Sequence, residues 1–231
     1  MKTKFYALIL ALFISLPTAF AQTTAEPDIH HADRFAQKAE IVKRGSIDVV
    51  FLGDSITHFW DEAGKAELEK YFGDLRLVNL GLGWNCTQHV LWELENIDAL
   101  AISPKAVMIM IGTNNIGNRK HSAEQVIAGN EAILKKVRTF WPDAKILLLG
   151  VFPRGKEPTN AYRATIQAVN AGLEKFADGE HIFFMDPGLV FLNADGTMRD
   201  EITRGDYLHL SPTGYDEWGK AVSPILHEWV K

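Results

Sequence analysis

Four residues whose types can act together in acyl transfer stand far apart along the chain: Ser55, Asn114, Asp206 and His209. A serine hydroxyl becomes an effective nucleophile when a neighbouring base removes its proton. His209 suits that task because imidazole titrates near neutral pH, and Asp206 can hold its second ring nitrogen. The side-chain amide of Asn114 can donate to the oxyanion of a tetrahedral intermediate. The residue types therefore predict serine-dependent acyl transfer.

Three small, polar, glycine-containing segments follow apolar runs and bring these residue types to strand ends. They are 53–57, which contains Ser55, 81–85, and 112–115, which contains Asn114. In an open parallel sheet, ligands bind beyond the carboxyl ends of the strands. We therefore expect all three segments to lie at one edge of a sheet, where Asp206 and His209 can reach them from a loop before the last helix.

The elements that must position these segments alternate along the chain. Nearly continuous apolar runs, typical of strands buried on both faces, occupy 47–52, 75–80, 106–111, 145–151 and 181–185. Helical patterns occupy 33–44, 62–71, 88–101, 122–141, 162–177 and 212–231. Gly45 is a candidate for ending the first helix, and Ser211 with Pro212 for starting the last. This alternation predicts an α/β fold with a five-stranded parallel sheet between helical layers.

Further residues are candidates for the same site. Backbone N–H groups of Ser55, Gly83 and Trp84 can complete an oxyanion hole together with Asn114. Substrate contacts are expected from three residues close to the predicted strand ends: Asp54, Trp60 and Arg154. A surface charge is an equally good interpretation of Arg154, and core packing is the default for Trp60.

Each motif also has an ordinary structural explanation when it is considered alone. A Gly-Asp-Ser sequence is a common turn, and a serine after a strand can simply cap a helix. Thr57 stands where a nucleophile elbow of the Gly-x-Ser-x-Gly type needs glycine, so a conventional α/β-hydrolase is disfavoured. Cys86 replaces the third glycine of a dinucleotide fingerprint. The order and topological positions of the motifs favour a catalytic site over a set of unrelated turns.

Composition excludes several other classes of protein. The 231 residues include 47% hydrophobic residues, 24 basic against 29 acidic residues, and one cysteine, with a formal net charge of −5. A mildly acidic chain is a poor candidate for nucleic-acid binding. One cysteine cannot form an internal disulfide, and the histidines show no metal-ligand spacing. We therefore expect no metal site.

The amino terminus has the pattern of an export signal. Lys2 and Lys4 precede an apolar run of about 12 residues, shorter than the roughly 20 that span a bilayer. Small residues at Ala19 and Ala21 suit a cleavage site. We therefore expect a signal peptide over 1–21, a flexible segment over 22–31 and a single domain over 32–231. The mature protein would be secreted or periplasmic, without stable membrane insertion.

The motifs resemble those of the SGNH (GDSL-type) hydrolase superfamily. Its nucleophile block is similar to 53–56, its Asn block to 112–115, and its Asp–His block to Asp206-x-x-His209. Within the superfamily, one branch contains the catalytic subunits of platelet-activating factor acetylhydrolase and their bacterial relatives. This chain resembles that branch at 79–83, 89–92 and 152–155. The resemblance extends over about 47–215.

The resemblance implies a flavodoxin-like sheet in a three-layer sandwich and ester or acetyl hydrolysis without a cofactor. It implies Ser55 as nucleophile, His209 as base, Asp206 as its orienting group and Asn114 as oxyanion donor. One departure concerns Trp84, which stands where the family usually has glycine. Tryptophan has the required backbone N–H, but it resists backbone angles that glycine adopts freely.

Two classes of function follow from these observations. The first is a secreted serine esterase that acts on short-chain, acetyl-type esters, including esters of carbohydrates, with a lysophospholipase or thioesterase of the same mechanism as an alternative. The second is a non-catalytic carbohydrate-binding protein on the same scaffold, with Trp60 and Trp84 on an aromatic rim. The sequence leaves the acceptor, the acyl length and the oligomeric state open.

Overall fold

The structure, a computed structural model, describes residue 24 and residues 32–231. A five-stranded parallel sheet runs through its middle in the order β2-β1-β3-β4-β5. The strands are β1 (Val49–Gly53), β2 (Leu77–Asn79), β3 (Ala106–Met110), β4 (Lys145–Leu149) and β5 (Ile182–Met185). This order is that of flavodoxin-like sheets, in which the chain reverses direction across the sheet after β2. The predicted α/β fold is confirmed.

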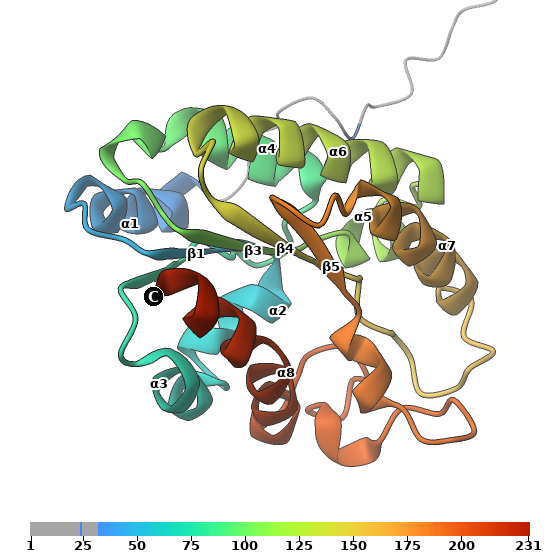
Figure 1. The fold of residues 1–231 in the computed structure, drawn as a ribbon. Helices are drawn as coiled ribbons and strands as arrows, with labels where there is room; N and C mark the ends of the chain where they lie inside the picture. The colour runs from blue at the N-terminus through green and yellow to red at the C-terminus, as the bar shows by residue number, and fades with distance from the viewer. Residues whose placement is uncertain (1–23, 25–31) are drawn as a thin grey trace, which may run out of the picture.

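Helices cover both faces of the sheet (Figure 1). One layer contains α1 (Ala32–Lys43), α4 (Thr87–Asn96), α6 (Ala123–Phe140) and α7 (Arg163–Leu173), and the other contains α3 (Lys65–Phe72) and α8 (Pro212–Val230). Two short helices follow strands directly: α2 (Ser55–His58) and α5 (Thr113–Gly117). Single 3₁₀ turns complete the chain at η1 (Phe59–Asp61), η2 (Ala99–Ala101), η3 (Glu174–Phe176), η4 (Pro187–Phe191) and η5 (Asp200–Ile202).

Alternate residues of each central strand enter different cores. On β1, Val50 and Leu52 pack with α4 and α6, whereas Val49 and Phe51 pack with α3 and α8. All five residues of β1 and of β3 are buried. Burial on both faces is the physical reason why these strands appear in the sequence as continuous apolar runs.

Helix ends follow the capping signals in the sequence. Gly45 adopts φ +71° just beyond α1, a left-handed conformation that favours glycine. The Ser211 hydroxyl accepts a hydrogen bond from the Gly214 N–H at 3.3 Å, and Pro212 occupies the first position of α8. Both predicted caps are therefore present.

Two predicted helices are interrupted. The pattern over 88–101 predicts one helix, but α4 ends at Asn96, Ile97 is extended, and a separate 3₁₀ turn follows. The Asn96 side chain donates to the Trp92 carbonyl, which satisfies one of the last acceptors of the helix. The pattern over 162–177 likewise ends in a 3₁₀ turn rather than in continued α-helix.

The predicted signal peptide and the segment 22–31, apart from Thr24, lie outside the described residues. Within the part of the chain that the structure describes, no helix is both long and apolar enough to span a bilayer.

Trp218 on α8 is the residue through which we test this packing. It is fully buried and contacts Trp60, Phe152 and Tyr215, with ring centroids 4.9–6.1 Å apart. Trp218→Ala should lower the free energy of unfolding by about 3–5 kcal/mol, measured by chemical denaturation, because it opens a large cavity. Leu100→Ala, at a side chain that is 79% exposed, is the control and should stay within about 0.5 kcal/mol of the wild type. Equal losses in both variants would contradict the described core.

Candidate active site

Ser55 is placed at the carboxyl end of β1, as the first residue of α2. The Asp54 carboxylate caps this short helix by accepting from the Ile56 N–H at 2.9 Å. The cap allows the chain to turn from extended to helical backbone within one residue, so the serine hydroxyl stands at the edge of the sheet. Ser55 is 9% exposed, enough for contact with a small ligand.

His209 meets Ser55 from the loop before α8. Its Nε2 lies 3.0 Å from Ser55 Oγ, although the two residues are 154 positions apart. Its Nδ1 lies 2.6 Å from Asp206 Oδ2, and Asp206 Oδ1 accepts from the Leu208 and His209 N–H groups. One carboxylate therefore shapes the turn and fixes the orientation of the imidazole ring.

The Asp206 carboxyl group stays charged. Partial burial raises its pKa, but the hydrogen bonds from the His209 side chain and from the backbone N–H groups of His209 and Leu208 together lower it below its ordinary value. A charged carboxylate favours the Nδ1–H tautomer of His209, which leaves Nε2 free to accept the serine proton.

Ser55, Gly83 and Asn114, whose N–H groups are the predicted oxyanion donors, line the same cavity. Within the described residues, the backbone N–H groups of Ser55 and Gly83 donate to no protein acceptor. One amide hydrogen of Asn114 is held by the Asn85 carbonyl at 2.9 Å, and its oxygen accepts from Asn118 at 2.9 Å. These contacts fix the orientation of the Asn114 amide and leave its second hydrogen available to a ligand.

Trp84 adopts the left-handed backbone conformation that glycine usually provides at this position of the family and that tryptophan resists. Its φ is +66°, in the left-handed region, at a cost of roughly 1–2 kcal/mol for a residue with a side chain. The turn after β2 therefore keeps the geometry expected of glycine. The indole is 65% exposed and lines the cavity in front of Ser55.

A buried polar network supports the oxyanion side of the site. The Asn85 amide donates to Glu93 Oε1 on α4 at 2.7 Å and lies 3.4 Å from the Gly53 carbonyl at the end of β1. Burial raises the pKa of Glu93 to about 8, partly offset by the hydrogen bond from Asn85. Asn85 thus connects α4, β1 and Asn114, and a neutral carboxyl group at Glu93 avoids a buried charge.

The site opens into a cavity of about 310 Å³. Ser55, Gly83, Trp84, Asn114, Arg154 and His209 line it, so the structure brings these predicted site residues together. The lining also contains four residues that the sequence analysis missed: Arg34, Phe59, Asn118 and Leu208. Phe59 packs against the His209 ring at a centroid distance of 5.2 Å. Its position four residues after Ser55, one helical turn on, was an available signal.

Two predicted substrate contacts are not supported. Trp60 is fully buried beneath the site, where it packs against Phe72, Tyr215 and Trp218, because the 3₁₀ turn after α2 directs it into the core. Asp54 is also fully buried and acts as a helix cap. Burial raises the pKa of Asp54 to about 7, and the Ile56 N–H and the charge of Arg154 offset part of that effect.

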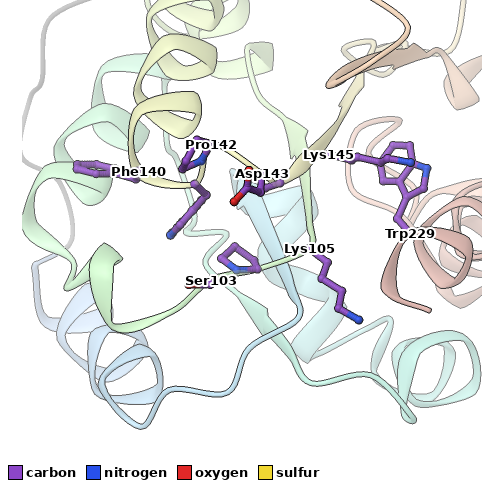
Figure 2. A pocket seen from close by; sticks show the side chains of 10 residues that line it. Ser103, Lys105, Phe140, Pro142, Asp143, Lys145 and Trp229 are labelled. Atoms are coloured by element: carbon purple, nitrogen blue, oxygen red, sulfur yellow. The ribbon is translucent and has the colours of Figure 1, made fainter.

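Other places in the described chain lack this combination of groups. No cluster of three or more histidine, cysteine, aspartate or glutamate side chains there has the geometry of a metal site. A second cavity of about 370 Å³ lies near the amino ends of β3 and β4, where Lys105, Lys145 and Trp229 surround it (Figure 2). It contains Ser103 but no histidine, so it offers no base for a serine nucleophile.

A parallel α/β sheet that carries serine, imidazole and carboxylate in hydrogen-bonded sequence at its carboxyl edge is the arrangement expected of an acyl hydrolase. Comparison with known families agrees with this class. Residues 51–217 match the model of the GDSL-like Lipase/Acylhydrolase family. The chain belongs to this family and is a carboxylic ester hydrolase, as its motifs predict.

Relatives of known activity carry the same indication. The chain is 38% identical over 183 residues to platelet-activating factor acetylhydrolase IB subunit alpha1 of Homo sapiens, which covers 78% of this chain and 75% of that protein. It is 35% identical over 188 residues to the human subunit alpha2, which covers 79% and 76%. These are the relatives that the blocks at 79–83, 89–92 and 152–155 indicate.

Solved structures share the fold at lower identity. A GDSL-like lipase from Bacteroides thetaiotaomicron superposes with a TM-score of 0.69 at 19% identity, covering 85% of this chain and 97% of that one. The acetylxylan esterase Axe2 from Geobacillus stearothermophilus superposes with a TM-score of 0.63 at 20% identity, covering 81% and 97%. Both support the observed sheet and helix arrangement.

The buried carboxyl of Glu93 predicts a pH-dependent stability. In the unfolded chain Glu93 loses its proton near its ordinary pKa of 4.5, whereas the folded protein keeps that proton to about pH 8. The stability of the wild type should therefore fall as pH rises between these values. Glu93→Gln preserves the acceptor for Asn85 and cannot ionise. Its Tm should exceed that of the wild type by an amount that grows from pH 5 to pH 8, at about 2–4 °C for each kcal/mol gained.

The control for this experiment is Glu95→Gln, the same substitution at an exposed residue of the same helix, where the carboxylate pairs with Lys136 at 2.6 Å. Its Tm should follow the wild-type pH profile. An equal pH dependence in Glu93→Gln and wild type, measured by differential scanning calorimetry, would show that Glu93 is charged in the folded protein.

Proposed function

We propose that this protein is an exported serine esterase that removes short acyl groups, above all acetyl, from alcohol acceptors such as carbohydrate hydroxyls. The observation that carries the proposal is the 3.0 Å distance between Ser55 Oγ and His209 Nε2, with Asp206 2.6 Å from the other ring nitrogen. This arrangement faces a cavity instead of being closed within the core.

The proposed reaction proceeds in two halves. Ser55 Oγ attacks the acyl carbon while its proton passes to His209 Nε2, and the carbonyl oxygen becomes an oxyanion held by N–H donors. The carbon–oxygen bond to the alcohol breaks, and His209 gives the proton to the leaving alcohol. A water molecule then gives a proton to His209 and attacks the acyl carbon. The bond between that carbon and Ser55 Oγ breaks, Oγ takes the proton back from His209, and the carboxylic acid is released.

The dimensions of the cavity support a short acyl group. Its volume of about 310 Å³ lies at the low end of the roughly 300–1,000 Å³ found for ligand pockets. Phe59 and Leu208 line it beside His209. The similarity to acetylhydrolase subunits favours acetyl over the long chains of a lysophospholipase.

The exposed indole of Trp84 supports a carbohydrate acceptor. A largely exposed tryptophan presents a flat apolar face and an N–H at its edge, which suits a sugar ring with both apolar and hydroxyl surfaces. The fold is shared with an acetylxylan esterase. The signal-like segment 1–21 supports secretion or a periplasmic location, where such substrates are encountered.

The test of this proposal is hydrolysis of short-chain aryl esters and acetylated sugars by the purified protein and by Ser55→Ala. The wild type should turn over acetyl esters faster than esters of eight or more carbons, and Ser55→Ala should lose about 10⁴-fold or more in kcat. Labelling by a serine-directed phosphonate should require Ser55. Equal turnover by both proteins would end the proposal, and glycan binding without Ser55-dependent turnover would favour the non-catalytic alternative.

The role of Asn114 gives a second prediction. Asn114→Ala removes one oxyanion donor and should lower kcat about 10²–10³-fold with a much smaller change in KM, since the donor acts mainly on the transition state. Asn96→Ala, at an exposed asparagine on α4, is the control and should keep wild-type kcat. A kcat for Asn114→Ala within twofold of the control would remove Asn114 from the oxyanion hole.

A further inference from the structure

The charge of the active-site cavity is opposite to that of the chain. The formal net charge of the protein is −5, yet the residues that line the cavity include Arg34 and Arg154 and no carboxylate. A third guanidinium, that of Arg204, lies 4.5 Å from the ring of Phe59, which is itself part of the lining. Positive charge is therefore concentrated where an ester must bind.

Contacts with the surrounding residues fix the position of the Arg154 side chain on one side of Ser55. Its guanidinium lies 4.9 Å from the ring centroid of Tyr162, and its Nη1 donates to the Thr113 carbonyl at 3.3 Å. Gly117 leaves the space that the Arg154 guanidinium occupies, because a Cβ at that position would overlap it. The buried side chain of Arg163 holds the Arg154 carbonyl at 2.9 Å, which fixes the backbone as well.

Arg34 lies on the other side of the nucleophile. Its Nη1 is 3.2 Å from the position that a Cβ would take on Gly83, so the guanidinium rests against the turn after β2. Arg154 rests against α5, which follows β3. Since β1 lies between β2 and β3 in the sheet, the two arginines flank Ser55.

Most of the donors of both guanidinium groups are unused. An arginine side chain has five N–H donors. Within the described residues Arg154 donates once, and Arg34 forms no hydrogen bond or ion pair. The Asp54 carboxyl senses the charge of Arg154 but is enclosed beneath the cavity and is bound to the Ile56 N–H, without an ion pair to the arginine. Both arginine side chains belong to residues that line the cavity that a substrate would fill.

We propose that Arg34 and Arg154 bind an oxyanion, either a carboxylate or a phosphate group, on the ester substrate, so that the physiological substrate is an anionic ester. This proposal rests on the proposed function and adds a substrate class to it. Two guanidinium groups that line one cavity and form no ion pair with the described residues match the forked geometry of carboxylate and phosphate oxygens.

The first test compares two esters of the same shape, 3-acetoxybenzoate and its uncharged methyl ester. The measured quantity is the ratio of kcat/KM for the anionic ester to that for the neutral ester, so that the intrinsic reactivity of each ester cancels between proteins. Arg154→Gln should lower this ratio about 10–100-fold and Arg34→Gln should also lower it, because charge-assisted hydrogen bonds are lost. Raised salt should lower the wild-type ratio.

Two further variants separate the placement of charge from its amount. Gly117→Ala keeps both arginines but displaces the Arg154 guanidinium, so it should lower the ratio as Arg154→Gln does. Arg44→Gln removes an exposed positive charge just beyond α1, away from the cavity lining, and should leave the ratio at the wild-type value. An unchanged ratio in Arg34→Gln, Arg154→Gln and Gly117→Ala would overturn the proposal.

A binding measurement keeps the two proposals distinguishable. Calorimetry on Ser55→Ala would use 3-acetamidobenzoate, its methyl ester and 3-acetamidophenyl phosphate, in which an amide replaces the scissile ester. Tighter binding of either anion than of the neutral compound, lost in Arg154→Gln, would support the oxyanion site even if no ester were hydrolysed. The anion that binds more tightly would identify carboxylate or phosphate as the group on the natural substrate. Equal affinity for all three compounds would refute the site whatever the outcome of the hydrolysis assay.

Discussion

A buried hydrogen bond joins the segment that carries Ser55 to the helix that follows His209. The Tyr215 hydroxyl on α8 donates to the Ile56 carbonyl at 2.6 Å, across 159 residues of sequence. Ile56 directly follows Ser55, and Tyr215 lies in the first turns of the helix that begins after His209. Burial raises the pKa of Tyr215 well above its ordinary value, so the hydroxyl remains a neutral donor. The backbone of Gly64 packs against the tyrosine ring and leaves no space there for a side chain. This contact and the packing of Trp60 against Tyr215 and Trp218 hold together the two segments in which Ser55 and His209 lie 3.0 Å apart.

Two aspartates at this edge of the sheet differ in charge state because their surroundings differ. Asp206 is partly exposed and accepts three N–H groups, so it stays charged and can stabilise an imidazolium. Asp54 is enclosed, accepts one N–H, and its second oxygen has no partner among the described residues. Burial raises the pKa of Asp54 to about 7, and the hydrogen bond from the Ile56 N–H offsets only part of that effect. Asp54, the neighbour of Ser55, is therefore a structural cap, whereas the carboxylate that contacts the imidazole belongs to Asp206, late in the chain.

The sequence was sufficient for features that depend on local pattern. Continuous apolar runs locate the strands, because a parallel sheet must be buried on both faces, and the segments after those strands contain Ser55, Gly83 and Asn114. It was insufficient where a side chain's direction depends on tertiary contacts. Trp60 stands five residues after Ser55 and yet enters the core, because a 3₁₀ turn changes the helical phase. Arg34 belongs to an amphipathic helix whose exposed residues look alike in the sequence, so nothing local distinguishes the one that reaches the cavity. The buried position of Glu93 was equally hidden, since its partner Asn85 lies in a turn outside the helix.

Two of the four residues other than glycine that have a positive φ in the described part of the chain stand beside the site. Trp84 and Tyr207 have φ of +66° and +51°, and they stand in the turn after β2 and in the loop between Asp206 and His209. Gly112, at φ +141° just before Asn114, packs so closely against Val126 and Val151 that a side chain would not fit. The left-handed conformations of Trp84 and Tyr207 cost stability relative to ordinary backbone, and they redirect the chain beside Gly83 and between Asp206 and His209. Such conformations persist only when contacts from the surrounding structure hold them in place. Here those contacts come from the sheet, which is buried on both faces, and from the hydrogen bond between Tyr215 and Ile56. The packed core therefore stabilises the strained edge of the sheet. Packing in the core holds the turn at Trp84 and the loop at Tyr207 in backbone conformations that are locally unfavourable.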